Sequence, residues 1–381
     1  MEINRKKISD VVFFQEGPGV RNTQYTNTGI KLLNVANLVD GKIDLTTSNR
    51  FISREEAYGK YKHFLVDDGD LVIASSGIKV DYFDKKMGFI DKSHLPLCMN
   101  TSTIRFKTLD ENTLNMKYFM YFLKSHDFKN QLLKQITGSA QLNFGPSHLK
   151  KMTIPLIKLD TQLGVAERLD KILEVKELRE KQKKLLDDLI KSRFVEMFGD
   201  PTINDKNMIE KKLSELGYLG RGISKHRPRN DPTLLGGPYP LIQTGDVANS
   251  ELYINTFKNT YSDFGLKQSK MWGKGTLCIT IAANIAKTAI LNFDACFPDS
   301  VVGFISNECT NNIFMYYWFD FFQEILEYQA PESAQKNINL KILNNLNVIV
   351  PPIELQNQFA EFVKSVDKSK FYVCLFYENI R

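Results

Sequence analysis

The first 110 residues alternate short apolar runs with turn residues, a pattern typical of β-strands joined by tight turns. Apolar runs occur at residues 30–35, 71–74 and 103–106. Aromatic and aliphatic residues then recur every three or four positions over residues 113–135, which predicts a helix with one apolar side. The aromatic run at residues 118–122 has this helical spacing. We therefore expect it to pack the helix onto a sheet and not to stack on bases.

The same order of elements returns in the second half of the chain. Ser139-Ala140-Gln141-Leu142-Asn143 is matched by Ser333-Ala334-Gln335-Lys336-Asn337 at an offset of 194, and residues 155–162 are matched by residues 351–358 at an offset of 196. A period of half the chain predicts two copies of one domain, because solenoid repeats are far shorter. The segments between the matching parts diverge, which favours two modules that read different things. The second copy has strand-like runs at residues 239–243, 277–281 and 301–305 and a helix over residues 311–328.

The clearest helical pattern lies between the copies, at residues 160–198. Leucine and isoleucine form a stripe on one face, and charged residues cover the other. At 1.5 Å per residue this helix would be about 58 Å long, and a helix of that length needs a partner along its stripe. The equivalent helix that starts near Leu355 is the natural partner, and we expect an imperfect, antiparallel coiled coil.

That second helix is expected to be shorter than the first. At the offset of 196 it has no counterpart of residues 186–198, and residues 371–377 are apolar on all sides. Either this end is buried against a partner or the end of the reading frame is altered, and the second explanation is favoured.

Composition narrows the class of protein. A chain of 381 residues with 43% hydrophobic and 25% charged residues is globular and long enough for two domains. Its net charge of +6 permits a polyanionic partner. The five cysteines show no Cys-x-x-Cys spacing, which suggests reduced core thiols in a cytoplasmic protein. We expect no membrane association, because the most apolar stretch, residues 314–322, is too short to span a bilayer.

The ordered duplication resembles the specificity subunit of type I restriction-modification systems. The resemblance rests on the Ser-Ala-Gln-x-Asn loop, an apolar strand into Ile-Pro or Val-Pro-Pro, and a Leu-x-x-Gln helix start, each present twice. It implies an α+β fold with two β-rich target-recognition domains and small helices, separated by long α-helices that pair as an antiparallel coiled coil. The implied parts are residues 1–155 and 201–350 as recognition domains, 156–200 as the central spacer and docking helix, and 351–381 as the shortened distal helix.

The resemblance further implies a non-catalytic subunit that recognises a bipartite DNA target. Its partners would be double-stranded DNA, two modification (methyltransferase) subunits and a restriction (endonuclease/translocase) subunit. The residues agree with the absence of catalysis and cofactors: the chain has no methyltransferase motif, no phosphate loop and no metal spacing among its five histidines. The alternative is a coiled-coil scaffold that joins other proteins without reading DNA.

The best local candidate for DNA contact is the basic loop at residues 220–230, because arginine can grip guanine with two N–H groups. Its counterpart in the first copy, residues 17–25, is less basic but rich in amide and hydroxyl groups. The divergent segments at residues 75–82 and 283–287 lie where the family's recognition loops lie. The candidate residues in these four segments are Arg21, Asn22, Gln24, Lys79, Tyr82, Arg221, Lys225, His226, Arg227, Arg229 and Lys287.

Four further candidates recur in both copies: Gln141, Asn143, Gln335 and Asn337. Their recurrence argues against reading of a particular target. Phosphate contact, or support of the loop against the helix, fits better, and a purely structural role carries equal weight.

Overall fold

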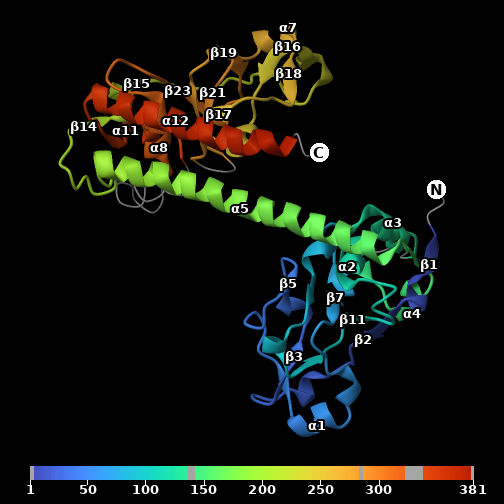
Figure 1. The fold of residues 1–381 in the computed structure, drawn as a ribbon. Coiled ribbons are helices and arrows are strands. Elements are labelled where there is room, and N and C mark those ends of the chain that lie inside the picture. Colours follow the sequence, from blue (N-terminus) through green and yellow to red (C-terminus); the bar gives the residue numbers. More distant parts are fainter. Residues whose placement is uncertain (1–3, 136–141, 283–285, 322–337, 379–381) are drawn as a thin grey trace. The chain divides into compact units, whose positions relative to one another are not determined.

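The computed structural model describes residues 4–135, 142–282, 286–321 and 338–378, and the chain packs as two units, Met1–Lys176 and Glu177–Arg381 (Figure 1). The division falls inside the longest helix, α5 (Leu159–Phe198), whose 40 residues begin in the first unit and end in the second. The predicted helix at residues 160–198 is thereby confirmed. Among the described residues, no helix combines the length and apolar character that a bilayer crossing requires.

The first unit is β-rich, as predicted. Its strands are β1 (Arg5–Lys7), β2 (Val12–Glu16), β3 (Ile30–Leu33), β4 (Leu38–Val39), β5 (Lys42–Ile43), β6 (Phe51–Ile52), β7 (Leu71–Ala74), β8 (Ser76–Ile78), β9 (Met87–Phe89), β10 (Leu97–Met99), β11 (Thr103–Thr108), β12 (Leu142–Asn143) and β13 (Thr153–Pro155). The main sheet is antiparallel in the order β2-β11-β7-β9, and a second sheet has the order β10-β3-β6. Its helices besides α5 are α1 (Arg54–Tyr58), α2 (Met116–Lys124), α3 (His126–Gln135) and α4 (Pro146–Leu149).

The single helix predicted over residues 113–135 is wrong in one respect, because it is two helices that meet at Ser125. Ser125 has an extended backbone (φ −71°, ψ 155°), and its hydroxyl accepts a hydrogen bond from the N–H of Phe128 (3.2 Å). A serine that caps a helix in this way competes with helix continuation. The predicted core role of the aromatic run is confirmed: Phe119 is fully buried against Phe106 of the main sheet, with ring centroids 5.2 Å apart.

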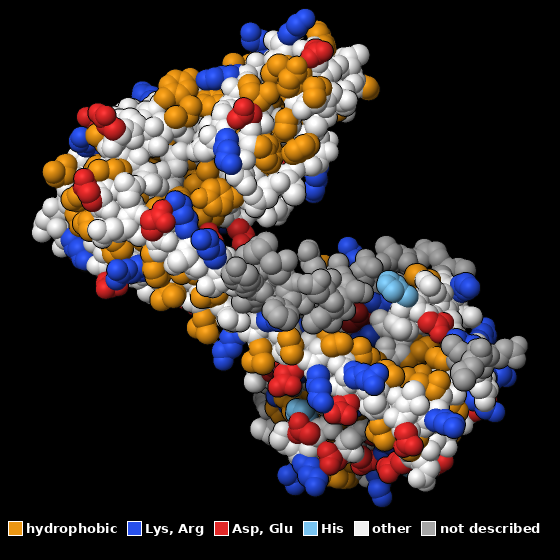
Figure 2. Space-filling model, turned by 45° about the horizontal axis from the view of Figure 1, so that its top comes forward, with side chains coloured by type: hydrophobic (Ala, Val, Ile, Leu, Met, Phe, Trp, Pro, Cys, Tyr) orange, Lys and Arg blue, Asp and Glu red, His pale blue; other side chains and the backbone are white. Residues whose placement is uncertain are grey.

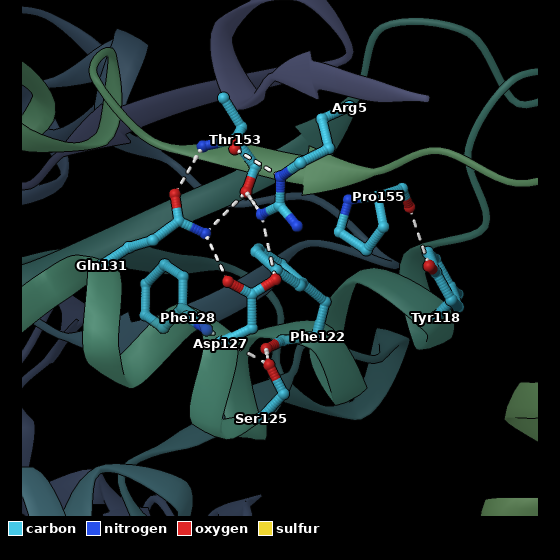
Figure 3. Close-up of polar contacts among 9 residues, drawn as sticks. All are labelled: Arg5, Tyr118, Phe122, Ser125, Asp127, Phe128, Gln131, Thr153 and Pro155. Carbon is cyan, nitrogen blue, oxygen red and sulfur yellow. Dashed lines mark hydrogen bonds and ion pairs between the residues drawn. The ribbon is translucent and has the colours of Figure 1, made fainter. Parts of the chain in front are cut away.

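A polar cluster holds the strand pair β1-β13 on helix α3 (Figure 3). Arg5 donates to the carboxylate of Asp127 (2.9 Å). The side-chain amide of Gln131 donates to the carbonyl of Thr153 (2.9 Å) and accepts from its N–H (2.8 Å), as a neighbouring strand would. Strand β13 leads directly into α5, so this cluster fixes the entry of the long helix on the first unit.

The second unit repeats this plan. Its strands are β14 (Glu210–Lys212), β15 (Gly217–Arg221), β16 (Leu235–Leu241), β17 (Tyr253–Ile254), β18 (Asn259–Tyr261), β19 (Met271–Trp272), β20 (Leu277–Thr280), β21 (Thr288–Leu291), β22 (Ala295–Cys296), β23 (Val301–Ser306) and β24 (Asn347–Ile349). The main sheet has the order β15-β23-β20-β21-β17, and a second sheet has the order β18-β16-β22-β19. The helices besides α5 are α6 (Thr244–Ala248), α7 (Asp263–Lys267), α8 (Asn312–Trp318), α11 (Leu340–Asn345) and α12 (Ile353–Glu378).

Within the second unit, α12 runs antiparallel to the end of α5 (Figure 1). Phe194 of α5 packs edge-on against Phe359 near the start of α12, with ring centroids 5.5 Å apart. Further along, Lys370 of α12 forms an ion pair with Asp187 of α5 (2.6 Å). Helix α8 adds Phe314, which stacks on Phe194 (5.4 Å). The antiparallel pairing is therefore confirmed, and aromatic side chains provide its core.

One buried glutamine in each unit holds the start of its long helix. Gln162 and Gln356 are fully buried, and each accepts from a backbone N–H, that of Asn115 (2.9 Å) or Asn311 (3.0 Å). Each also donates to the carbonyl five positions earlier, at 2.8 Å in both. These two glutamines are structural equivalents, and their offset is 194.

The expected match of residues 155–162 with residues 351–358 at an offset of 196 is therefore wrong by two residues. Strand pairing gives the same answer, because Thr153 of β13 pairs with Lys7 and Asn347 of β24 pairs with Lys212 at corresponding ends of β1 and β14. The prolines at both sites suggested an offset of 196. The buried side chains of Gln162 and Gln356 and the strand pairs β1-β13 and β14-β24 show that the offset is 194.

Candidate nucleic-acid interface

In the first unit, a turn between β10 and β11 connects two of the predicted contact segments. Gly17, in the segment 17–25, donates its N–H to the carbonyl of Thr103 (2.9 Å). A Cβ atom at Gly17 would lie 2.0 Å from the carbonyl oxygen of Asn100, so only glycine fits there. On the other side, Ser76 in the segment 75–82 shares a hydroxyl hydrogen bond with Ser102 (2.6 Å). The turn at residues 100–103 thus supports both segments.

The second unit has the same arrangement. Gly222 donates its N–H to the carbonyl of Val301 (2.9 Å), and a Cβ there would lie 2.3 Å from the carbonyl oxygen of Pro298. Ile281, just after β20, donates to the carbonyl of Ser300 (3.0 Å), as Ser75 does to Ser102 in the first unit (2.8 Å). The predicted correspondence of the loops at residues 17–25 and 220–230 follows the sheet, with Gly17 equivalent to Gly222.

The basic loop of the second unit converges on Asp299, which lies in that turn. Arg221 donates through Nε to the backbone carbonyl of Asp299 (2.8 Å). Arg229 forms an ion pair with its carboxylate (2.6 Å), and the guanidinium of Arg227 approaches the other carboxylate oxygen at 3.8 Å. Both ion-paired arginines are about half exposed, and both guanidinium groups are already engaged within the loop and the turn. The structure brings these three candidates together through a residue that the sequence did not single out.

The other two candidates of the basic loop differ in their freedom. His226 is half-buried and contacts the carboxylate of Asp231 through Nε2 (3.0 Å). Backbone and side-chain hydrogen bonds from Thr233, followed by the contact with His226, lower the pKa of Asp231. His226 therefore has a structural partner within the loop. Lys225 is exposed, and its backbone N–H donates to the carbonyl of Gln268 (3.2 Å). Its ammonium group makes no hydrogen bond or ion pair with the described residues.

In the first unit, the three candidates in the segment 17–25 also have different roles. Arg21 and Asn22 are exposed at the start of the 3₁₀ turn Asn22–Gln24. The side-chain amide of Gln24 instead donates to Glu56 (2.7 Å) and accepts from the N–H of Arg21 (3.0 Å). Gln24 thus positions the loop, and its polar groups are already used.

Lys79 and Tyr82 lie together at a cavity of about 390 Å³ that sequence reasoning did not foresee. Gly77, Lys85 and Lys86 also line this cavity. Tyr82 is 55% exposed, and Lys85 is paired only loosely, at 3.6 Å, with Asp40, which also lines the cavity. Lys86 donates through Nζ to the carbonyl of Leu38 (2.8 Å), so Lys79 and Lys85 are the lysines whose charge suits a phosphate with an adjoining sugar or base. The available signal was the recurrence of lysine three times within eight residues after a divergent strand.

The remaining candidates are placed only in part. Asn143 is exposed in β12, which pairs with β8 so that Asn143 faces Ser76. Lys287 is exposed just before β21. Gln141, Gln335 and Asn337 lie outside the described residues.

Charge on the described surface is mixed. On the face drawn in Figure 2, lysine and arginine side chains are scattered among carboxylates and are not gathered in one field. Among the described residues, no cluster of three or more His, Cys, Asp and Glu side chains could hold a metal ion. The candidate loops offer hydrogen-bond donors and cations, and these groups are suited to binding an anionic polymer.

The interiors behind the loops differ between the units, although the sheets match. Arg105 on β11 is buried and donates to the side chain of Gln15 (2.8 Å) and to the carbonyl of Leu65 (2.6 Å). Its equivalent on β23 is Gly303, where a Cβ atom would lie 2.6 Å from the ring of Trp272. One unit therefore fills this position with a polar network and the other with a tryptophan.

Comparisons with known proteins agree with the duplication. The family model described as type I restriction modification DNA specificity domain matches residues 3–187 and again residues 205–371. The type I restriction enzyme MjaVIII specificity subunit of Methanocaldococcus jannaschii is 27% identical over 206 residues, which are 53% of this chain and 46% of that protein. A protein of the same organism described as the MjaX specificity subunit is 22% identical over 360 residues, 89% of this chain and 80% of that protein.

Solved structures show the same fold. The S subunit of a type I restriction-modification system from M. genitalium has a TM-score of 0.59 at 15% identity, over 99% of this chain and 93% of that chain. A chain from a structure of a type I R-M system has a TM-score of 0.53 at 16% identity, over 97% and 92% of the two chains. The α+β class with two β-rich domains and long helices is confirmed.

Proposed function

Because this chain belongs to the type I restriction modification DNA specificity domain family, we propose that each of its units reads one half of a bipartite DNA target. One observation carries the proposal: both units build the same turn with two attached loops, and the loops carry different side chains. A repeated frame is suited to the shape of duplex DNA, which is the same at both half-sites. The divergent side chains are suited to base edges, which differ.

The chain would act as a non-catalytic subunit that brings the modification and restriction subunits to this target. The relatives named as specificity subunits of type I restriction enzymes support this assignment. Helix α5 belongs to both units, and its 40 residues correspond to about 60 Å of helix. Half-sites one turn apart are separated by about 34–36 Å along the duplex. A helix of this length can therefore set the spacing between two half-sites.

The test is co-expression with the neighbouring modification subunit, followed by single-molecule sequencing of the host DNA. We expect a stable complex and methyladenine on both halves of a split motif. A continuous motif, or one that stays the same when residues 1–155 are exchanged for another module, would contradict the proposal.

A second measurement separates DNA reading from a protein scaffold. DNA binding must weaken steeply with salt, because cations that contact phosphates release counterions from the duplex. Binding of the purified full chain to a duplex that carries the sequenced motif is measured between 50 and 200 mM salt. A flat salt dependence would favour the scaffold.

A further inference from the structure

Among the described residues, Asp299 is the one carboxylate that meets more than one arginine of the basic loop. Its carboxylate is one-third exposed and touches Arg229 at 2.6 Å, and its backbone carbonyl accepts from Nε of Arg221. The residue lies in the turn that holds Gly222 of the basic loop and Ile281 at the end of β20. Any ligand that approaches the basic loop therefore meets a negative charge as well.

The arginines around Asp299 are not equally available. Arg227 uses its NH1 group on the carbonyls of Ser224 (2.6 Å) and His226 (2.8 Å), so it mainly shapes the loop. Arg221 is anchored through Nε, and its NH1–NH2 edge makes no hydrogen bond with the described residues. That edge is the one that grips guanine O6 and N7. Arg229 is held by the carboxylate itself, so its guanidinium is the group that a loss of Asp299 would release.

The equivalent turn in the first unit has no such charge. Thr101 occupies the position of Asp299 and is exposed, and the nearby loop carries the single arginine Arg21. A carboxylate thus occurs at this position only in the unit whose loop is strongly basic. Attachment of the loops does not require it, since the two main-chain bonds that join each turn to its flanking segments occur in both units.

We propose that Asp299 is a specificity-determining residue of the second unit, because its carboxylate withholds Arg229 from indiscriminate phosphate contact. The inference rests on the proposed function, because it assumes that this loop meets DNA. A carboxylate beside base-reading arginines repels phosphates at wrong sites, and this repulsion is offset only where the correct base contacts form. Asp299 would therefore lower non-specific binding more than specific binding.

The experiment compares the full chain with Asp299→Asn, which removes the charge and keeps the shape. The probes are a 30-base-pair duplex that carries the sequenced motif and the same duplex with both half-sites shuffled. For the shuffled duplex we expect binding on the order of fivefold tighter at 100 mM salt, with a salt slope steeper by about 0.9, since one arginine becomes free for a phosphate. The ratio of specific to non-specific affinity should fall by a similar factor.

Glu308→Gln is the matched control, because Glu308 is exposed in the same unit and lies beyond the far end of β23. Six strand residues place it about 20 Å from the turn, outside the range of unscreened charge effects. This variant should leave both affinities unchanged. Arg229→Gln in the Asp299→Asn background should restore the original slope, which identifies the released group.

Three results would each have a distinct meaning. If the unaltered chain binds neither duplex in a salt-dependent way, the proposed function itself is wrong. If it discriminates but Asp299→Asn matches Glu308→Gln, only the role of Asp299 is overturned. Should Asp299→Asn fail to fold, Arg229→Gln alone provides the test: it should leave the salt slope of non-specific binding unchanged, because a withheld Arg229 contacts no phosphate, and a shallower slope would contradict the withheld state.

Discussion

Replacing Gln356 by alanine should unfold the second unit at a much lower urea concentration. Its side-chain amide accepts hydrogen bonds from the N–H of Asn311 and the hydroxyl of Thr310, both at 3.0 Å. It also donates to the carbonyls of Cys309 (3.1 Å) and Pro351 (2.8 Å). Alanine would leave these groups unsatisfied near the buried start of α12. A buried polar group that loses its partner costs about 1–3 kcal/mol, so the sum after partial hydration is about 3–5 kcal/mol.

Tryptophan fluorescence reports this unit alone, because the only two tryptophans of the chain, Trp272 and Trp318, are both buried in it. With a urea dependence of about 2.5 kcal/mol per M, the midpoint should fall by about 1–2 M. Gln358→Ala is the matched control, since Gln358 is exposed two residues away and should shift the midpoint by little. Equal midpoints for the two variants would refute the structural role of Gln356.

Three further outcomes are expected. Deleting residues 178–184 removes about 10 Å of α5 and should shorten the unspecified spacer of the sequenced motif by about three base pairs, and an unchanged spacer would contradict the role of α5. Replacing Lys79 and Lys85 together by alanine should make the salt slope shallower by about 1.8 and weaken binding to all duplexes equally; a loss confined to one base pair would argue against phosphate contact. Partial burial raises the pKa of Asp320, whose side chain stays 33% exposed, against the opposing effect of Lys191, so a small stability that its protonated form contributes at low pH is lost as pH rises through the folded-state pKa. Asp320→Asn should therefore raise the urea midpoint of the second unit at pH 7 and have little effect near pH 4, and an equal shift at both pH values would exclude titration as the cause.

Features of the fold that depend on local periodicity could be predicted from the sequence. The apolar spacing of α5 and the aromatic spacing of α2 are visible in the chain, because the period of a helix sets which residues share a face. The break at Ser125 was missed, since a serine is tolerated in a helix and only its hydroxyl contact with Phe128 reveals the cap. The offset of 196 failed for a similar reason. Gln356 and Gln358 look alike in the sequence, and only the tertiary packing shows that Gln356 is the buried one.

The candidate site was predictable as loops and not as contacts. The glycines and arginines of residues 220–230 mark a basic loop, but its main acidic partner, Asp299, lies 70 residues from Arg229 in the sequence. No local pattern identifies a carboxylate at that separation. Gln24 shows the converse limit: an amide in a polar loop looks available until Glu56 is found at 2.7 Å.

The turn at residues 100–103, and its equivalent at residues 298–301, has a consequence for how such a protein can diversify. Each turn holds two contact loops through main-chain bonds and through a glycine that tolerates no other side chain. A substitution in the turn therefore shifts both loops together, whereas a substitution at a loop tip acts by itself. Inherited changes of target should then arrive either as single altered bases or as wholesale replacement of a half-site, with few intermediate steps between them.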